Sequence, residues 1–292
     1  MPGEFVKVEH VSYSYPDGTN ALTDVSIDFE QGESVALIGQ NGSGKTTLAK
    51  LLKGLLKPSG GKVYIGGVDA KEQTIAQLAR QVGYVFQNPS HQIFSMTIFD
   101  EVAFGLRNLG VSEEEIKGRV AAALGDVGLH QRDAENPLFL SKGEKQRLAV
   151  ASVMVMNPKV LILDEPTTGQ DWRNIEAMMN LVGSLREKYN QTSIIITHNM
   201  HVVAEWAQRS VVMSKARVIF DGETRSLFSE PQVLSSAFIT PTAAIRLGED
   251  FRMTNHPLTV GEFVKAFELT RRGPDAPVGG AASRGQGGAS AA

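Results

Sequence analysis

A glycine-rich segment at residues 39–46 limits the possible folds of this chain more than any other feature. It reads GQNGSGKT and fits the pattern G-x-x-x-x-G-K-[ST] without substitution. The residues before it, ESVALIG, predict a short buried strand, and the residues after it, TTLAKLLKGLL, predict a helix. A strand, a glycine loop and a helix in this order are typical of an α/β fold built on a parallel sheet.

The residue types of this loop suit a nucleoside triphosphate. Its glycines allow positive φ, so that successive N–H groups and the start of a helix can point at phosphate oxygens. We expect Lys45 to reach the β- and γ-phosphates and the Thr46 hydroxyl to ligate Mg²⁺. The plainer alternative is a glycine-rich turn before an ordinary helix, and the strand–loop–helix context weighs against it. The predicted nucleotide-binding residues here are Gly39, Gln40, Asn41, Gly42, Ser43, Gly44, Lys45, Thr46 and Thr47.

Composition excludes several classes of protein. With 292 residues and 42% apolar content, the chain can bury a substantial core as one large or two small domains. A net charge of −3 provides no bulk attraction to nucleic acid or to an anionic membrane, and no nucleic-acid partner is expected. The absence of cysteine excludes disulfides and cysteine-ligated zinc and fits a reducing cytoplasm. We expect neither a signal peptide nor a membrane-spanning helix, because no stretch approaches ~20 apolar residues.

The rest of the chain predicts a parallel α/β core with additions. Residues 5–15 and 22–29 alternate in the manner of antiparallel strands around a turn at 16–18. Residues 97–156 predict a helical insertion, in which Ser112 with Glu115 and Ser141 with Glu144 have the spacing of capping boxes. Further strands are predicted at 62–66, 82–86, 160–163 and 193–197, with a strand pair around 210–220.

These elements predict three regions. Residues 1–230 form a P-loop NTPase core with an N-terminal antiparallel β-subdomain and a helical subdomain at about 90–156. Residues 231–271 form a small C-terminal α extension of short helices, in which Thr259 is a candidate cap. Residues 272–292, which include GPDAPVGGAASRGQGGASAA, predict a disordered tail.

Two adjacent carboxylates form the second informative motif. The segment VLILDEP at 160–166 predicts a buried strand that ends in Asp164 and Glu165. Because α/β folds bind ligands at the carboxyl edge of the sheet, both side chains are expected beside the phosphate loop. Asp164 is then a candidate Mg²⁺ ligand, and Glu165 a candidate base for the water that attacks the γ-phosphorus. The alternative is a polar turn, which the upstream phosphate loop makes the weaker interpretation.

The segment LSKGEKQRLAVA at 140–151 resembles the signature of ATP-binding cassette (ABC) proteins, which elsewhere reads LSGGQ. The resemblance implies that Gln87 is the glutamine-loop residue, which contributes to catalysis and to the metal site, and that His198 is the switch histidine. It also implies that Asp171 belongs to the D-loop and that adenine stacks on Tyr15. Taken singly, Tyr15 is also compatible with an edge-strand aromatic, and His198 with a hydrogen-bonded histidine at a strand end. The motifs keep the family order over 15–198, and the resemblance extends to about residue 230.

The signature segment implies that two cassettes work as a pair. Ser141, Gly143 and Glu144 are expected to complete the ATP site of a second, head-to-tail subunit, identical or related. The helix that Ser141 caps would supply N–H groups and a positive helix end to the γ-phosphate. This chain departs from the family with Lys142 for a glycine and Glu144 for a glutamine. Lys142 is expected either to add charge near the phosphate or to point to solvent, and reduced activity of that ATP site is one outcome.

The stretch QNPSHQIFSMTIFDEVAFGLRNLG at 87–110 resembles the ATPases of energy-coupling factor (ECF) transporters, which drive uptake of vitamins and transition-metal ions. This resemblance implies a transmembrane coupling protein, a substrate-binding membrane subunit and a location on the cytoplasmic face of the cell membrane. Ile93, Phe94 and Met96 then either line a groove for a coupling helix or pack beneath the helical insertion. The extension at 231–271 is a candidate dimerisation element.

Other functions fit the sequence less well. The main competitor is the ATPase of another ABC importer or of an exporter. A non-transport ABC protein acting on DNA or ribosomes usually carries a long coiled-coil insertion or two cassettes, and neither occurs here. A phosphotransferase on the same loop would lack the signature segment. The sequence names neither the transported substrate nor the identity of the partner cassette.

Overall fold

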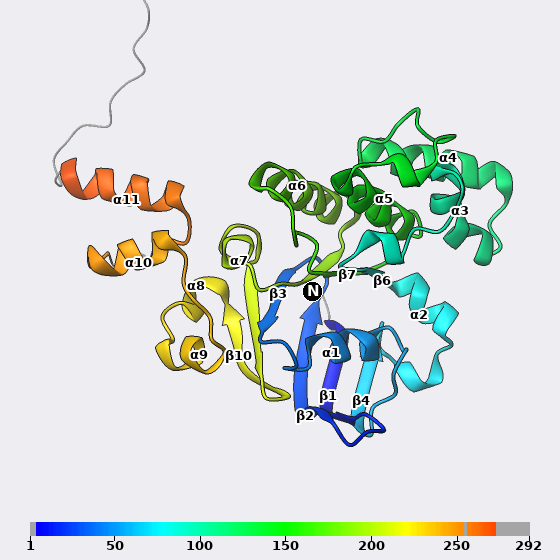
Figure 1. Ribbon diagram of the computed structural model, residues 1–292. Coiled ribbons are helices and arrows are strands. Elements are labelled where there is room, and N and C mark those ends of the chain that lie inside the picture. The colour runs from blue at the N-terminus through cyan, green and yellow to red at the C-terminus, as the bar shows by residue number, and fades with distance from the viewer. Residues whose placement is uncertain (1–3, 254–255, 273–292) are drawn as a thin grey trace, which may run out of the picture. The chain divides into compact units, whose positions relative to one another are not determined.

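Alternating apolar residues build an antiparallel sheet near the start of the chain (Figure 1). The computed structural model describes residues 4–253 and 256–272. Val25, Ile27 and Phe29 are buried on one face, as the alternation predicts. The sheet has the order β2-β1-β4-β5. Its strands are β1 (Glu4–Ser14), β2 (Asn20–Glu30), β4 (Gly60–Ile65) and β5 (Val68–Asp69).

The strands of the second sheet have no charged residue in their interiors, except Asp221 in the edge strand β10. Its order is β10-β9-β3-β8-β7-β6, and all neighbours are parallel except β10 and β9. Strands β7 and β8 are buried almost throughout, because helices cover both faces of a parallel sheet. The strands are β3 (Ser34–Gly39), β6 (Val82–Val85), β7 (Val160–Asp164), β8 (Thr192–Ile196), β9 (Arg209–Ser214) and β10 (Arg217–Glu223).

Helix α1 (Lys45–Leu52) joins the two sheets through one core. Its buried Leu48, Leu51 and Leu52 belong to a cluster that includes residues from both sheets. The helix is shorter than predicted, because Gly54 adopts φ +69° and ends it. The remaining helices around the sheets are α2 (Ile75–Gln81), α6 (Trp172–Tyr189), α7 (Met200–Trp206), α8 (Thr224–Leu227) and α9 (Pro231–Ser236), with 3₁₀ turns η1 (Ala70–Glu72) and η2 (Pro89–His91).

The predicted helical insertion has a core of its own. It comprises α3 (Ile98–Asn108), α4 (Glu113–Asp126), η3 (Pro137–Phe139) and α5 (Lys142–Met154). Buried apolar residues of α3 and α4 form one cluster with Leu148 and Ala151 of α5, whereas other buried residues of α5 pack with β7, β8 and α6. The capping box at Ser141 is complete. The box predicted at Ser112 was wrong in one half: its hydroxyl accepts from Glu115 N, but the Glu115 carboxylate binds Arg119 instead of returning to the cap.

The chain divides into two units between Thr242 and Ala243, beyond the boundary at residue 230 placed from the sequence. The second unit contains α10 (Ala243–Asp250) and α11 (Val260–Arg272). The Thr259 hydroxyl accepts a hydrogen bond from Glu262 N at 3.1 Å, the contact expected of a helix cap. Apart from Arg272, the tail predicted at 272–292 lies outside the described residues.

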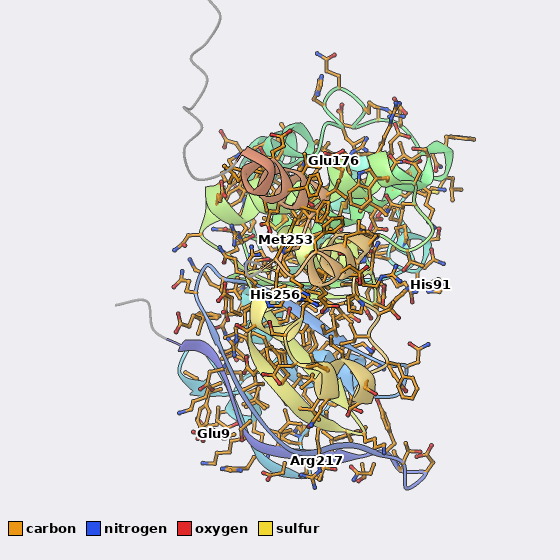
Figure 2. The ribbon with its side chains drawn as sticks, turned by 90° about the vertical axis from the view of Figure 1, so that its left-hand side faces the viewer. Glu9, His91, Glu176, Arg217, Met253 and His256 are labelled. Carbon is orange, nitrogen blue, oxygen red and sulfur yellow. The ribbon has the colours of Figure 1, made fainter. Side chains whose placement is uncertain are left out.

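Figure 2 shows the β-strands of the first unit toward the bottom of the view and many of its helices toward the top. Glu9 of β1 and Arg217 of β10 lie near one end, and Glu176 of α6 lies toward the other. Within the part of the chain that the structure describes, no helix combines the length and the apolar character needed to cross a bilayer.

Candidate nucleotide site

The phosphate loop connects β3 to α1 with the backbone geometry that its glycines predict. The φ angles are 146° at Gly39, 79° at Gly42 and 109° at Gly44. A Cβ atom on Gly44 would lie 2.4 Å from the carbonyl oxygen of Ala21, so this position excludes a side chain by crowding as well as by φ. The loop therefore brings backbone to the carboxyl edge of the sheet at the start of a helix, which is an arrangement suited to phosphate.

The ammonium group of Lys45 lies within this loop. Its Nζ donates to Gly39 O at 2.7 Å and to Gln40 O at 2.8 Å, and the residue is 8% exposed. Burial lowers the pKa of Lys45 from its usual value, and the nearby carboxylates of Glu165 and Asp164 act in the opposite direction. A buried cation held by neutral carbonyl groups is well placed to bind the oxygens of a polyphosphate.

Asp164 ends β7, and its carboxylate accepts a hydrogen bond from the Tyr84 hydroxyl of the neighbouring strand β6 at 2.5 Å. Burial, followed by this contact, raises the pKa of the Tyr84 hydroxyl well above its usual value. The tyrosine therefore remains a proton donor to Asp164 and fixes one of its oxygens. No motif in the sequence pointed to Tyr84, because an aromatic residue is common in any strand.

Glu165 follows in a backbone conformation that residues other than glycine rarely adopt, with φ 48°. Its N–H donates to Ile196 O at 2.8 Å, and its Oε1 lies 2.7 Å from His198 Nδ1. The Glu165 side chain is 15% exposed, whereas that of His198 is 74% exposed. Left-handed backbone at a strand end costs of the order of 1 kcal/mol and is often kept where it directs a functional side chain.

The parallel strands bring the predicted residues to one edge. Strands β6, β7, β8 and β3 run in the same direction, so the residues after them meet at their carboxyl ends. There Glu165 contacts His198, and the carboxylates of Glu165 and Asp164 lie near enough to Lys45 to raise its pKa against the effect of burial. Gln87 lies on the same edge after β6 and is exposed, and no hydrogen bond found in the described residues joins it to the others.

Tyr15 lies beside the first turn of α1, although it follows a strand of the other sheet. Its hydroxyl is 3.0 Å from Thr47 Oγ1, and its ring meets Tyr13 edge-on at 5.0 Å. The ring is partly exposed. This position is compatible with a base stacked on one face while the phosphates occupy the loop.

The signature segment lies on the surface. Ser141 caps α5, and one oxygen of Glu144 accepts from both Ser141 N (2.8 Å) and Ser141 Oγ (2.6 Å). The other Glu144 oxygen pairs with Arg132. The Ser141 hydroxyl and N–H, then Arg132, lower the pKa of Glu144 to about 2. Glu144 is therefore ionised at neutral pH and satisfies the same Ser141 groups that the resemblance assigns to a phosphate.

The Lys142 side chain is exposed, as one of the two sequence-based alternatives expects, and it also contacts its own chain. Its Nζ donates to Thr168 O at 2.8 Å and to Gly169 O at 3.2 Å, in the loop between Glu165 and α6. Asp171 in the same loop caps α6 by accepting from Asn174 N at 3.0 Å. The segment and the loop are thus fastened together within one chain.

Sequence reasoning missed a residue that anchors the stretch after β6. Gln92 accepts from Phe86 N at 3.2 Å and donates to Ala149 O of α5 at 2.9 Å. An amide in a loop has no pattern that could have revealed this role. Of the residues that follow, Ile93 packs against the core of the helical insertion, whereas Phe94 and Met96 are 63% and 74% exposed.

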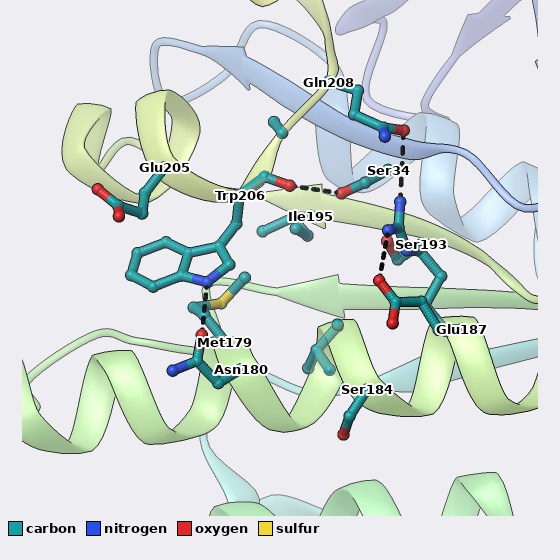
Figure 3. A pocket seen from close by; sticks show the side chains of 14 residues that line it. Ser34, Met179, Asn180, Ser184, Glu187, Ser193, Ile195, Glu205, Trp206 and Gln208 are labelled. Atoms are coloured by element: carbon teal, nitrogen blue, oxygen red, sulfur yellow. Dashed lines mark hydrogen bonds and ion pairs between the residues drawn. The ribbon is translucent and has the colours of Figure 1, made fainter. Parts of the chain in front are cut away.

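A separate pocket lies at the amino ends of β3 and β8, between α6 and α7 (Figure 3). Some of its polar groups are paired with one another: Trp206 Nε1 donates to Asn180 at 3.0 Å, and Ser34 Oγ donates to Trp206 O at 2.9 Å. Because it contains neither the phosphate loop nor the paired carboxylates, the chemistry described above belongs to the opposite edge.

The residues at that edge fit Mg²⁺ in their chemistry. Thr46, Gln87 and Asp164 supply a hydroxyl, an amide oxygen and a carboxylate, which are the oxygen ligands that this hard cation prefers. Tyr84 occupies one oxygen of Asp164. The second oxygen has no contact among those that the structure shows.

Comparisons with known proteins agree with this geometry. A family model described as ABC transporter matches residues 22–168. The energy-coupling factor transporter ATP-binding protein EcfA2 of Caldanaerobacter subterraneus subsp. tengcongensis is 39% identical over 260 residues, which cover 87% of this chain and 91% of that protein. The structure of cbiO1 from Clostridium perfringens, part of the ABC transporter complex cbiONQ, is 35% identical with a TM-score of 0.74, covering 86% of this chain and 99% of that one.

The chain therefore belongs to the ABC transporter family, and the predicted fold class is confirmed. Another relative from the same Caldanaerobacter, named as an ABC transporter ATP-binding protein, is 45% identical over 250 residues, but this chain spans only 44% of its length. Within the family, the similarities to EcfA2 and cbiO1 support the energy-coupling factor type.

Proposed function

We propose that this chain is the ATP-hydrolysing subunit of an energy-coupling factor type importer, which drives uptake of a vitamin or a transition-metal ion. The observation that carries the proposal is the Glu165–His198 pair beside Lys45, at one edge of a parallel sheet. These residues combine a cation for the phosphates with a carboxylate that can accept a proton, which is what hydrolysis of a phosphoanhydride requires.

Each residue has a defined part in the proposed reaction. Lys45 and the loop N–H groups bind the β- and γ-phosphates of ATP, and Tyr15 stacks on adenine. Glu165 orients the attacking water and takes up its proton, while His198 holds Glu165 from the other side. Thr46, Gln87 and Asp164 would hold Mg²⁺, which neutralises charge on the phosphate oxygens. The constrained backbone of Glu165 keeps its carboxylate aimed at the site.

The signature segment supports pairing with a second cassette. Ser141, which is exposed, and Gly143, which is partly exposed, lie at the start of α5, where the N–H groups of a helix end can meet an anion from outside the chain. ATP would then contact both cassettes and close the pair, and loss of the γ-phosphate would open it. Glu144 already binds Ser141, so closure requires the Ser141 donors to exchange a carboxylate for a phosphate.

An exposed apolar patch supports a membrane partner. Phe94 meets Phe104 edge-on at 4.8 Å, and both rings are exposed together with Met96. An apolar patch of this kind suits a helix from a transmembrane coupling protein. The chain would then sit on the cytoplasmic face of the membrane, with a separate membrane subunit binding the substrate.

The proposal is tested by isolating the tagged full-length chain from membranes of its own host and identifying its partners. We expect a second ATP-binding cassette, identical or related, and a transmembrane protein that binds no substrate by itself. Phosphate release without any acceptor should accompany the complex. A single membrane subunit that both spans the bilayer and binds substrate would favour another importer or an exporter, and recovery with DNA or ribosomes alone would overturn the transport function.

A further inference from the structure

Lys142 stands where the signature of the family has a glycine, and it connects two segments with different tasks. Its ammonium group donates to the carbonyl oxygens of Thr168 and Gly169, at 2.8 and 3.2 Å. Lys142 begins α5, whereas the two carbonyl groups belong to the loop after β7. Glycine has no side chain and could not make this connection.

The loop that Lys142 holds also holds Glu165. Thr168 Oγ1 donates to Glu165 Oε2 at 3.3 Å, and Thr168 N donates to Glu165 O at 3.2 Å. The other oxygen of Glu165 lies 2.7 Å from His198 Nδ1. A continuous path of hydrogen bonds therefore runs from Lys142 through Thr168 to the carboxylate proposed as the base.

The loop leaves room for the ammonium group at Gly169, which has no side chain. Gly169 adopts φ +68°, and a Cβ atom there would lie 2.6 Å from Lys142 Nζ. Close by, Gly143 approaches Asn174 of α6, where a Cβ atom would meet Asn174 Oδ1 at 3.4 Å. The start of α5 and the start of α6 are thus packed so closely that a displacement of one helix would move the other.

We propose that Lys142 is a positioning residue that couples the two ATP sites of a cassette pair. The proposal rests on the proposed function, in which Ser141 faces the ATP of the partner while Glu165 serves the ATP bound to its own chain. When the γ-phosphate of one ATP engages the start of α5, Lys142 shifts the loop at 168–169 and sets Glu165 in the other site. In this proposal both ATP sites influence the position of the same loop. Coupling between two binding sites requires a structural element of this kind, whose arrangement both sites affect.

The test compares Lys142→Met, which keeps the aliphatic stem and removes the donors, with Lys142→Arg, which retains donors for the carbonyl groups. Lys145→Met on the same helix is the matched control. The readouts are kcat, the Hill coefficient for ATP, the affinity for ATP and Tm, all on the full chain. We expect Lys142→Met to lower kcat by about 2- to 30-fold, the usual range for residues in a coupling network, and to bring the Hill coefficient toward 1.

ATP affinity and Tm should stay at wild-type values in Lys142→Met, and Lys142→Arg should restore both kcat and cooperativity. Equal kcat and Hill coefficients in the wild type, Lys142→Met and Lys145→Met would overturn the inference and leave the proposed function intact. A loss that Arg does not restore would also contradict it. By contrast, a wild-type chain that releases no phosphate from ATP would remove the proposed function itself.

Discussion

The crowding at Gly44 predicts how strongly the phosphate loop resists a single added methyl group. A Cβ atom there would lie 2.4 Å from Ala21 O and 2.8 Å from Leu22 Cδ2, at φ 109°. Left-handed backbone costs a residue with a side chain about 1–2 kcal/mol, and forcing an atom into a packed site adds about 1–3 kcal/mol. Gly44→Ala should therefore destabilise the protein by about 3 kcal/mol, which lowers Tm by about 6–12 °C in a domain of this size.

Substitutions at two other glycines distinguish the cost of backbone strain from the cost of crowding. Gly42 has φ 79° with no atom within 4 Å of a Cβ, so Gly42→Ala should cost only the backbone strain and lower Tm by about 2–8 °C. Gly118 is exposed in α4 with open space around it, and Gly118→Ala should raise the free energy of unfolding by about 0.5–1 kcal/mol.

Thermal unfolding followed by circular dichroism measures all three variants. A nucleotide-binding titration then shows whether the loop of Gly44→Ala still holds ATP, which we expect it to lose. If Gly44→Ala and Gly42→Ala lowered Tm equally, the crowding around α1 would not exist, and the loop geometry described above would be wrong.

The remaining predictions concern single side chains. Lys45→Ala should weaken ATP binding by at least about 100-fold, because a buried charge-assisted contact is lost. Calorimetric titration with Mg²⁺–ATP measures this affinity, and a value near that of the wild type would contradict the role of Lys45. The pKa of Glu144 is about 2 in the folded chain against its usual 4.5, so its contribution to stability is complete above pH 4.5 and is lost as the pH falls toward 2. The Tm of the wild type should therefore be higher than that of Glu144→Gln at pH 6, and the difference between the two Tm values should shrink between pH 5 and pH 3. The control Glu176→Gln, on the exposed face of α6 (Figure 2), should show no such convergence.

Much of the fold was predictable because local patterns and tertiary structure agree. Uncharged runs such as VLIL became buried parallel strands, and the glycines of the phosphate loop adopted the positive φ that their positions require. The Ser141–Glu144 box formed because its two partners are only three positions apart, within one helix turn. Glu115 has the same spacing, but the nearby cation Arg119 took its carboxylate, and spacing alone does not reveal that competition.

The contacts that depend on tertiary structure could not be predicted. Tyr84 reaches Asp164 from the neighbouring strand, and Lys142 of α5 reaches Thr168 in the loop after β7, so neither pairing has a signal in local sequence. The motifs located the candidate residues at one sheet edge, since parallel strands bring their carboxyl ends together. Which side chains contact one another at that edge was decided by packing.

The most direct test of the account is hydrolysis by Glu165→Gln. Loss of the carboxylate base should reduce phosphate release from ATP by about 10²–10⁴-fold, while ATP binding stays near that of the wild type because Lys45 and the loop are untouched. The measurement is phosphate release from Mg²⁺–ATP by equal amounts of the two proteins, with binding measured in parallel. A Glu165→Gln chain that releases phosphate at the wild-type rate would contradict the central role given to this residue.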